Sequence, residues 1–551
     1  MNRRTPMTPN LWGASVLFLA AALGCQAGAK PETPAPAPDQ AETSAEVPAA
    51  AEIPSDLDLV ILNGRVMDPE TKLDAVRNVG VKDGKIVAVT EQAIEGAETL
   101  DAKGHVVAPG FIDTHVHVVD QPFAQKLLLR DGVTTPLDLE VGASPLDRFY
   151  DTLEGKSQTN YGATASILGA REKVFNPKYE SKTGNICTDI FAKDEHSFVD
   201  MKWSTVVPTE EQIGQINQML EDGLKRGALG IGVPVGYATQ GVTSRETTAW
   251  QKLAGKYGRA VFVHGRFSSQ RPPTTGILGF EEFIANVGIY GGGLMLQHMH
   301  QQALSTSEDA LKMIDDARAK GLSVIGEIYP YNFGATIVGA DYLKPDNYGP
   351  NMGRTYKDII EISTLKPLTK ARYEELVKKS PGTSAMFYGA TEEDMLAALA
   401  HPSSTIGSDA FPLTVSKTGA MAVDWDIAYE DVQGHPRTAG THSGVLRMVR
   451  EKKLMPLMTA IAKMTSMPAK FLEENGVAQM AQKGRIQVGA DADITIFDPD
   501  TVTDNSTMQQ GGLPATGIPY VIVNGTVVVK DSKVLNDVYP GEPIRAAIQN
   551  Q

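Results

Sequence analysis

Cysteine is nearly absent from this chain. Only Cys25 and Cys187 occur among 551 residues, so neither a disulfide framework nor a thiolate metal scaffold is expected. Positive charge is also scarce: 51 Lys and Arg stand against 66 Asp and Glu, and the net charge of -15 argues against a nucleic-acid partner. With only ten histidines in the chain, the places where they gather become informative.

An apolar run, "LWGASVLFLAAALG", lies near the start of the chain and is too short for a comfortable membrane span. It follows the basic "MNRR", so residues 1–25 are predicted to be a secretory signal. The segment resembles a bacterial lipoprotein signal, in which Cys25 would carry a lipid. Residues 26–55, rich in Pro, Ala and Glu, are predicted to form an extended tether. The resulting expectation is a periplasmic protein anchored to a membrane surface; an ordinary signal with a chance cysteine is the alternative.

Both ends of the remaining chain have strand-like patterns. Asn63-Gly64, Asp83-Gly84 and Asn524-Gly525 each separate two apolar runs, which predicts hairpin turns. We therefore expect residues 56–107 and 483–535 to form one small β-sandwich domain.

Between these ends, over residues 108–482, strand-like runs alternate with helical ones. Eight such strands predict an α/β fold, a TIM-like (β/α)8 barrel, whose functional groups stand at the carboxyl ends of the strands. Thr209 to Gln212 and Thr391 to Asp394 have the pattern of capping boxes at helix starts. Residues 332–390 break the rhythm and are predicted to be an insertion over the catalytic face.

Two histidines end the first predicted strand, in "FIDTHVH". Alternate residues of a strand face the same way, so His115 and His117 can both point into the barrel mouth. Neutral imidazoles that converge on one point are typical of a divalent metal site, with zinc as the expected ion. Four further predicted strand-end residues strengthen this interpretation: His264, His298, His300 and Asp409.

This order of residues resembles the amidohydrolase superfamily. More specific similarities are "GALGIGVPVGY" (227–237), "VFVHGR" (261–266), "YPY" (329–331), "IGSDA" (406–410), "HPRTAGT" (435–441), "MTSMPAKFLE" (464–473) and "GADADITIFDP" (489–499). Together they resemble the D-aminoacylase branch, the N-acyl-D-amino-acid deacylases. The resemblance spans roughly residues 57–535.

The resemblance implies a role for each matching residue. His115 and His117 would hold one metal position, and His264 and His298 the other. Asp409 would contact the metal and act as the general base that passes a proton from water to the leaving amine.

Two departures from the family pattern bear on the metal. The family has a cysteine ligand on the second strand, where this chain has Val141. The neighbouring Glu140 is predicted to bridge two metal ions instead, with Asp138 as the fallback and an ordinary salt-bridged strand-end residue as the bland alternative. No lysine ends "ALGIGVPVG", so the carbamylated lysine of cyclic-amide hydrolases has no candidate there.

Four residues are predicted to bind substrate. Arg437 of "HPR" would form a bidentate pair with a substrate carboxylate. Tyr329 would donate a hydrogen bond to the carboxylate or the carbonyl. His300 replaces the lysine that the family has near the carboxylate, and Arg266 faces the same way as His264. For Arg437 and Tyr329, a surface ion pair and simple packing are the structural alternatives.

The sequence thus predicts a hydrolase with one or two zinc ions that cleaves the amide of N-acyl amino acids, with D-configured ones favoured. A dipeptidase or an amidohydrolase for L-substrates is the alternative within enzymes. A catalytically silent binding lipoprotein is the alternative from another class.

Overall fold

The computed structural model describes residues 53–191 and 201–549. The predicted signal, residues 1–25, and nearly all of the tether lie outside these residues. In the described part of the chain, no helix combines the length and the apolar character needed to cross a membrane.

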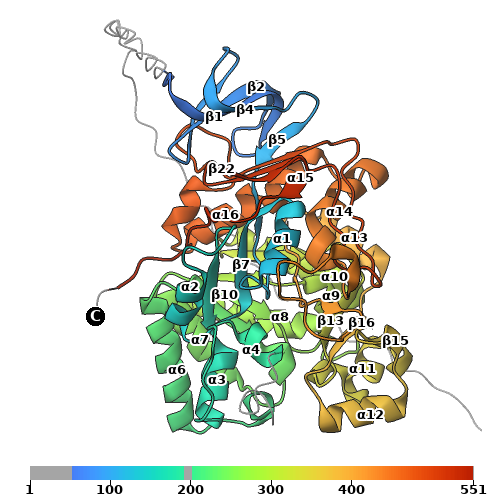
Figure 1. Ribbon diagram of the computed structural model, residues 1–551. Coiled ribbons are helices and arrows are strands. Elements are labelled where there is room, and N and C mark those ends of the chain that lie inside the picture. Colours follow the sequence, from blue (N-terminus) through green and yellow to red (C-terminus); the bar gives the residue numbers. More distant parts are fainter. Residues whose placement is uncertain (1–52, 192–200, 550–551) are drawn as a thin grey trace, which may run out of the picture. The chain divides into compact units, whose positions relative to one another are not determined.

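Eight parallel strands form the central sheet, as the sequence predicts (Figure 1). Their spatial order is β17-β12-β11-β10-β9-β8-β7-β6. Hydrogen bonds from Ala410 N to His115 O (3.1 Å) and from His117 N to Ala410 O (3.0 Å) join the two edges into a nearly closed barrel. The strands are β6 (Phe111–Asp113), β7 (Val133–Ala143), β8 (Gly162–Ser166), β9 (Gly230–Pro234), β10 (Ala260–His264), β11 (Gly293–Leu296), β12 (Val324–Ile328) and β17 (Ser404–Ile406).

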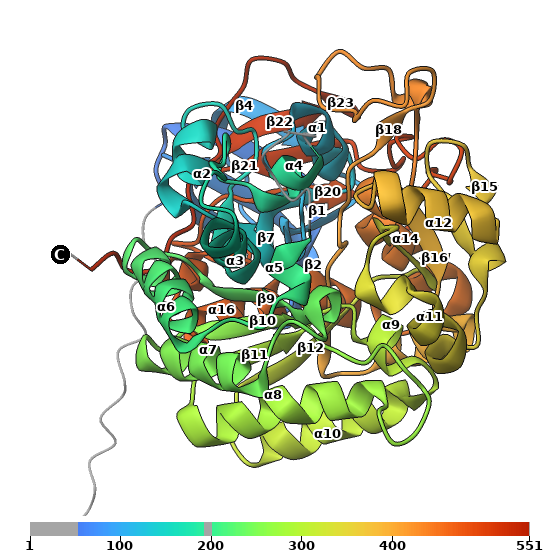
Figure 2. The ribbon, with the colours of Figure 1, turned by 90° about the horizontal axis from the view of Figure 1, so that it is seen from below.

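Helices follow most strands and cover the outside of the barrel (Figures 1 and 2). Both predicted capping boxes are confirmed, at Thr209 with Gln212 and at Thr391 with Asp394. The main helices are α1 (Pro122–Arg130), α2 (Leu146–Leu153), α3 (Ile167–Phe175), α6 (Glu210–Lys225), α7 (Ser244–Lys256), α8 (Gly276–Tyr290), α10 (Ser307–Ala319), α13 (Glu392–Ala400), α14 (Arg437–Lys452), α15 (Leu457–Met464) and α16 (Ser466–Glu474).

A separate small sheet follows β12. Strands β13 (Phe333–Ile337), β16 (Ser384–Tyr388), β14 (Ile359–Glu361) and β15 (Lys366–Pro367) pair in that order, and α11 (Pro345–Met352) and α12 (Lys370–Lys379) pack with them. Figure 2 shows this segment, in yellow, beside the barrel. Its strand β13 leads directly from the carboxyl end of β12, which places it next to the functional end of the barrel.

The two chain ends form one mixed sheet of nine strands. Strand β5 (Val106–Pro109) pairs with β20 (Ile494–Phe497), so residues from opposite ends of the sequence lie side by side. The edge strand β3 (Lys85–Thr90) also reaches the segment before β20, through the hydrogen bond from Ile86 N to Ala490 O at 2.9 Å. The sheet therefore folds back on itself around its own apolar core. Its other strands are β1 (Leu57–Asp68), β2 (Leu73–Lys82), β4 (Gly96–Asp101), β21 (Tyr520–Val523), β22 (Thr526–Lys530) and β23 (Lys533–Val534).

Two of the three predicted hairpin turns are confirmed. Asp83-Gly84 joins β2 to β3 and Asn524-Gly525 joins β21 to β22, with positive φ at all four residues, as two-residue hairpins require. The prediction for Asn63-Gly64 is wrong. Strand β1 runs through this pair, and its partners change there from β4 to β5, so the pair forms a bulge that bends one long strand.

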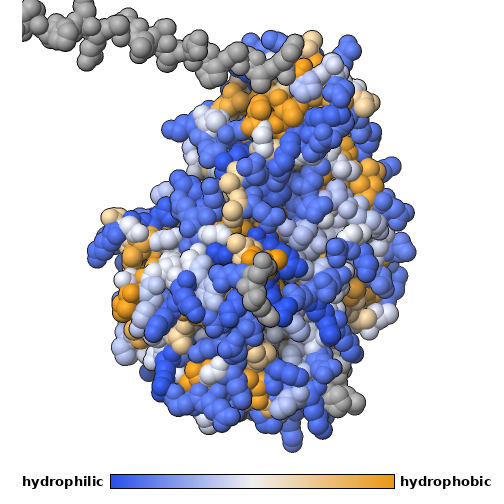
Figure 3. Space-filling view, turned by 90° about the vertical axis from the view of Figure 1, so that its left-hand side faces the viewer, coloured by the Kyte–Doolittle hydropathy of each residue, from blue (hydrophilic) through white to orange (hydrophobic). Residues whose placement is uncertain are grey.

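The surface on one side of the molecule is mostly hydrophilic (Figure 3). On that side, the largest group of apolar residues lies at the end formed by the nine-stranded sheet. Two exposed valines lie in this part of the chain: Val76 in β2 and Val488 just before β20.

Candidate metal centre and active site

His115 and His117 stand just beyond β6, where the chain passes between Asp138 and Ala410 of the neighbouring segments. Their rings meet edge to face, with centroids 4.9 Å apart. Both Nε2 atoms point to the same two carboxylates: they lie 3.2 and 3.1 Å from Glu140 Oε2, and 3.5 and 3.2 Å from Asp409 Oδ1. The alternation that the sequence suggested thus brings the two imidazoles to one point.

Glu140, in β7, lies at the centre of the cluster. While its Oε2 faces His115 and His117, its Oε1 lies 3.0 Å from His264 Nδ1 and 3.3 Å from His298 Nε2. Two ligand groups therefore share one carboxylate: His115, His117, Glu140 and Asp409 form one, and Glu140, His264 and His298 form the other. Asp138, the predicted fallback, lies outside both groups; its Oδ1 accepts a hydrogen bond from Gly142 N and lies 3.5 Å from His117 Nδ1.

The electrostatics of the cluster are dominated by burial and by opposite charges. Burial opposes the charged forms, but the four histidines outweigh it and hold the pKa of Glu140 well below its usual range. For His115, the carboxylates of Asp409, Glu327 and Glu140 outweigh burial and raise the pKa to about 10. Four imidazoles that converge on a shared carboxylate in a dry interior are a donor set of nitrogen and oxygen, which suits a divalent ion such as zinc.

Glu327 was missed by the sequence analysis. It is fully buried in β12, and its Oε2 lies 2.8 Å from His115 Nδ1 while accepting a hydrogen bond from His298 N at 2.9 Å. One oxygen thus contacts a histidine of each ligand group. The available signal was a glutamate inside the apolar run "LSVIGEIYP", a position where an acidic side chain needs a buried partner.

Asp409 follows β17 and has a left-handed backbone conformation, with φ of 52°. Its neighbour Ser408 donates its backbone N–H to Asp113 Oδ1 at 2.9 Å, and the same oxygen accepts from His115 N at 3.0 Å. Asp113 therefore fixes the segments after the first and last barrel strands relative to each other. Strained residues of this kind gather at functional sites, because the surrounding contacts must hold them in place.

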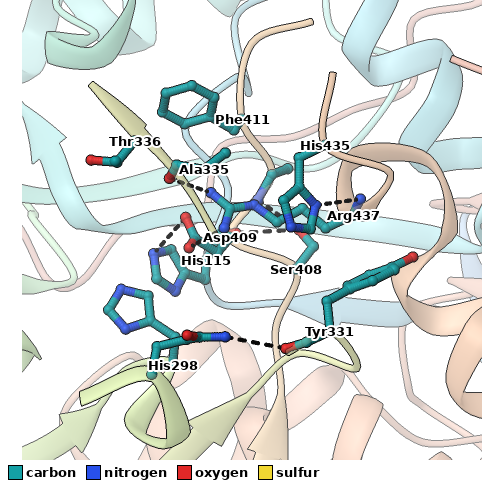
Figure 4. A network of polar contacts seen from close by, with 12 residues as sticks. His115, His298, Tyr331, Ala335, Thr336, Ser408, Asp409, Phe411, His435 and Arg437 are labelled. Atoms are coloured by element: carbon teal, nitrogen blue, oxygen red, sulfur yellow. Dashed lines mark hydrogen bonds and ion pairs between the residues drawn. The ribbon is translucent and has the colours of Figure 1, made fainter. Parts of the chain in front are cut away.

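Arg437, at the start of α14, lies against Asp409. Its Nη1 is 2.8 Å from Asp409 Oδ2 and its Nη2 donates to Ala335 O at 3.2 Å, as Figure 4 shows. The guanidinium sits between the rings of Tyr329 and Phe411, at 5.2 and 5.7 Å from their centroids. Its buried Nε has no hydrogen-bond partner among the described residues, so the group keeps a donor for a further anion.

A small cavity of about 10 Å³ lies over the second ligand group. His264, His298 and Asp409 line it, together with Arg437 and Tyr329. The segment after β12 contributes Ala335, Tyr342 and Phe387, so the predicted insertion forms part of its wall. Tyr237, Ser268, Gln301 and Gln302 complete the lining. Burial raises the pKa of Tyr329 well above its ordinary value, so its hydroxyl stays a hydrogen-bond donor.

Two predicted substrate contacts differ from the structure. His300 is not part of the cavity wall: its ring packs on Tyr329 and its Nε2 lies 3.0 Å from Tyr331 O, and burial lowers its pKa to about 3. Arg266 also turns away, pairing with Glu282 at 2.9 Å and donating to Val242 O at 3.0 Å. The reason is the same for both. Strand alternation ends at His264 and Leu296, so residues beyond those points no longer keep the facing of a strand.

Gln302 is a second residue that the sequence analysis missed. Its Oε1 accepts a hydrogen bond from Gly265 N at 2.9 Å, and its Nε2 lies 3.0 Å from His298 Nδ1. It therefore connects the segments that follow β10 and β11, each of which carries one histidine of the second ligand group.

Comparison with known proteins agrees with this geometry. The profile of the Amidohydrolase family matches residues 350–529. An N-acyl-D-glutamate deacylase from Alcaligenes xylosoxydans xylosoxydans is 29% identical over 503 residues, which cover 86% of this chain and 93% of the relative. The chain is thus similar to members of the amidohydrolase superfamily along most of its length. A D-aminoacylase from the same organism is 25% identical, with 86% of this chain and 94% of the relative covered.

Solved structures of deacylases share the fold of this chain. A crystal structure of N-acyl-D-glutamate deacylase from Bordetella bronchiseptica, complexed with zinc and a phosphonate inhibitor, has a TM-score of 0.69 and 24% identity. The match covers 89% of this chain and 100% of that one. A D-aminoacylase structure has a TM-score of 0.65 with 22% identity and the same coverage.

Proposed function

We propose that this protein removes the acyl group from N-acyl amino acids, with D-configured ones favoured. The observation that carries the proposal is the pair of ligand groups that share Glu140, with Asp409 and Arg437 side by side at the edge of one cavity. The curated relatives that cover most of the chain are deacylases of N-acyl-D-amino acids, which supports this substrate class.

Zinc, as one or two ions per chain, is the proposed cofactor. His115, His117 and Asp409 would hold one ion, His264 and His298 the other, and Glu140 would contact both. When bound, the metal supplies Lewis-acid polarisation of the scissile carbonyl and makes the attacking water more acidic. The donor atoms lie within 4.8 Å of one another in each group, which supports this assignment.

Asp409 is the proposed general base. Burial disfavours its charged form, but Arg437 and His115 outweigh this effect and lower its pKa, so the carboxylate is ionised at neutral pH. It would remove the proton from the attacking water and deliver it to the leaving amine nitrogen. Tyr329, which packs beside Arg437, would donate its hydroxyl to the substrate.

A hydrolysis panel on metal-analysed protein tests the proposal. N-acetyl-D- and N-acetyl-L-amino acids, dipeptides and a cyclic amide are compared, with Asp409→Asn as the variant. We expect fastest turnover of an N-acetyl-D-amino acid, and a loss of more than about tenfold in Asp409→Asn with zinc content retained. Preferred turnover of L-substrates, dipeptides or the cyclic amide, or near-normal turnover by Asp409→Asn, would contradict the proposal.

The place of the protein in the cell is a separate proposal. Residues 1–25 support secretion, and a lipid on Cys25 followed by the tether of residues 26–55 would leave the enzyme in the periplasm at a membrane surface. Membrane fractionation of the full chain and of Cys25→Ala tests the anchor. We expect the variant to leave the membrane fraction; unchanged fractionation would exclude the anchor.

A further inference from the structure

A second cavity lies beside the cluster, on the side of the first ligand group. Its volume is about 40 Å³. Six apolar side chains account for most of its wall: Leu168, Ile190, Phe191, Trp203, Ile337 and Phe411. No Lys, Arg, Asp or Glu lines it in the part of the chain that the structure describes. An apolar lining of this kind suits the apolar part of a small ligand.

This cavity adjoins the proposed reaction centre. His117 of the first ligand group lies on its wall, and Phe411 follows Asp409 by two residues. Tyr237 lines both cavities, so it stands between them. The cluster is therefore flanked by two spaces: His264 and His298 line the first, and His117 lines the second.

The two spaces differ in charge. The first holds Arg437, whose Nε is free for an anion, whereas the second offers hydrocarbon and aromatic surface. Burial raises the pKa of the Cys187 thiol in the second wall, so this side chain is neutral as well. A molecule with a carboxylate at one end and an apolar group at the other, joined by an amide, matches this division.

We propose that the second cavity binds the acyl group of the substrate and selects acyl chains longer than acetyl, such as linear aliphatic ones. This inference rests on the proposed function. Each methylene that enters the cavity should raise kcat/KM by about fourfold, because the burial of a methylene is worth about 0.8 kcal/mol. The amino-acid half of the substrate would occupy the first cavity, with its carboxylate at Arg437.

A chain-length series tests the proposal. N-Acetyl, N-butyryl and N-hexanoyl derivatives of one D-amino acid are assayed with the wild-type enzyme, Ile190→Trp and Leu168→Phe. Both substitutions place bulk in the second cavity without touching a histidine or carboxylate of the cluster. We expect wild-type kcat/KM to rise with chain length. In either variant the hexanoyl derivative should lose more than about tenfold in kcat/KM, and it should lose more than the acetyl derivative does.

A control in the first cavity distinguishes the roles of the two cavities. Ala335→Val adds bulk to the first cavity, so it should lower kcat/KM for all three acyl groups alike. A second series keeps the acetyl group and varies the amino-acid side chain from D-Ala to D-Leu. Ile190→Trp should leave this second series unchanged.

The outcomes are distinguishable. A wild-type enzyme without chain-length dependence, or a variant that discriminates by amino-acid side chain, overturns the acyl assignment while leaving the proposed function intact. Failure of the zinc-loaded wild type to hydrolyse any of these derivatives overturns the proposed function itself. If Ile190→Trp does not fold, Leu168→Phe gives the same comparison. The wild-type enzyme offers a further test, in which acetate, butyrate and hexanoate are compared as competitive inhibitors of acetyl-substrate turnover. Inhibition should strengthen with chain length; equal inhibition constants contradict the proposal.

Discussion

Glu327 contacts one histidine of each ligand group through a single oxygen. Its Oε2 serves a ring nitrogen of His115 and the backbone N–H of His298, whose φ of 32° is unfavourable without support. A carboxylate that accepts from the far nitrogen of a ligand histidine fixes its ring and tautomer. Glu327 is thus placed to orient both ligand groups without being a ligand itself.

We therefore predict that Glu327→Gln weakens zinc binding by about 10- to 100-fold, the range for loss of such an outer partner. Zinc affinity is measured by chelator competition, together with metal content. Glu361→Gln is the matched control, because this buried glutamate of β14 pairs with Arg372 rather than with a histidine. Equal affinities in Glu327→Gln and the wild type would show that Glu327 only fills space.

Arg437 forms an ion pair with Asp409, the proposed base, and is also proposed to bind the substrate carboxylate. Arg437→Met should lower kcat/KM for carboxylate-ended substrates. The corresponding loss of transition-state stabilisation should be about 2–4 kcal/mol, the scale of losing a charged partner at a desolvated site. Because Asp409 also loses its ion pair, a smaller loss is expected for a carboxamide-ended analogue. The two substrates are compared in the same assay, and an equal loss on both would assign Arg437 to Asp409 alone.

The residues that could be read from the sequence share one property. His115, His117, Glu140 and His264 stand in or near the ends of strands, where period-two alternation gives the direction of a side chain. His300 lies in α9 (Met299–Ala303), which begins right after the left-handed His298, so alternation gave the wrong direction. Glu327 and Gln302 act through other residues, and no local pattern marks such a role.

At the scale of elements, the helix α15 holds an unusual buried cation. Lys463 Nζ lies 2.7 Å from Ser404 O and 2.8 Å from Ser404 Oγ, at the start of β17. Burial lowers its pKa from 10.5 to about 7. Between these two values the unfolded chain binds a proton that the folded chain does not, so this lysine makes the free energy of unfolding increase with pH.

Lys463→Met should remove that dependence. The wild-type free energy of unfolding should gain up to about 1.4 kcal/mol per pH unit relative to the variant between pH 7 and 9. Denaturant titrations at several pH values measure the difference. Lys470→Met in α16 is the control, because that side chain is 70% exposed. Parallel pH profiles for the wild type and Lys463→Met would mean that the lysine stays charged when buried.

The barrel strands were predictable as elements because each is a short apolar run between helical segments. The bulge at Asn63-Gly64 was not, since its sequence is that of a turn. What decides the outcome there is the pairing of the two halves of β1 with different strands, β4 and β5, and this pairing is not local.

At the scale of the whole molecule, Asp493 joins the nine-stranded sheet to the barrel. Its Oδ2 pairs with Lys483 Nζ at 2.6 Å and accepts from Asn160 Nδ2 at 3.0 Å, while its Oδ1 accepts from Asn524 N at 2.8 Å. Asn160 precedes barrel strand β8, whereas Asn524 lies in the β21–β22 turn. One buried carboxylate thus connects three separate parts of the sequence.

Asp493→Ala should therefore lower the free energy of unfolding by about 3–5 kcal/mol, because it leaves the buried charge of Lys483 without this partner. We expect calorimetry to show a single unfolding transition at a lower temperature, because the sheet and the barrel lose the same contact. Asp491→Ala is the control, since this more exposed residue also pairs with Lys483, at 3.0 Å. Two separate transitions in Asp493→Ala would show that sheet and barrel unfold independently.

The pairing of β5 with β20 also affects when the sheet can form during biosynthesis. Strand β5 is made early, but its partner at Pro109 is Ile494, so the sheet cannot close until Ile494 has been synthesised. At about 5–20 residues per second, that interval is on the order of tens of seconds. Throughout it, the early strands have unsatisfied edges and the nascent polypeptide cannot reach its final form. The proposed secretion would benefit from this delay, because the first strands of the sheet stay unpaired with β20 while the rest of the chain is made.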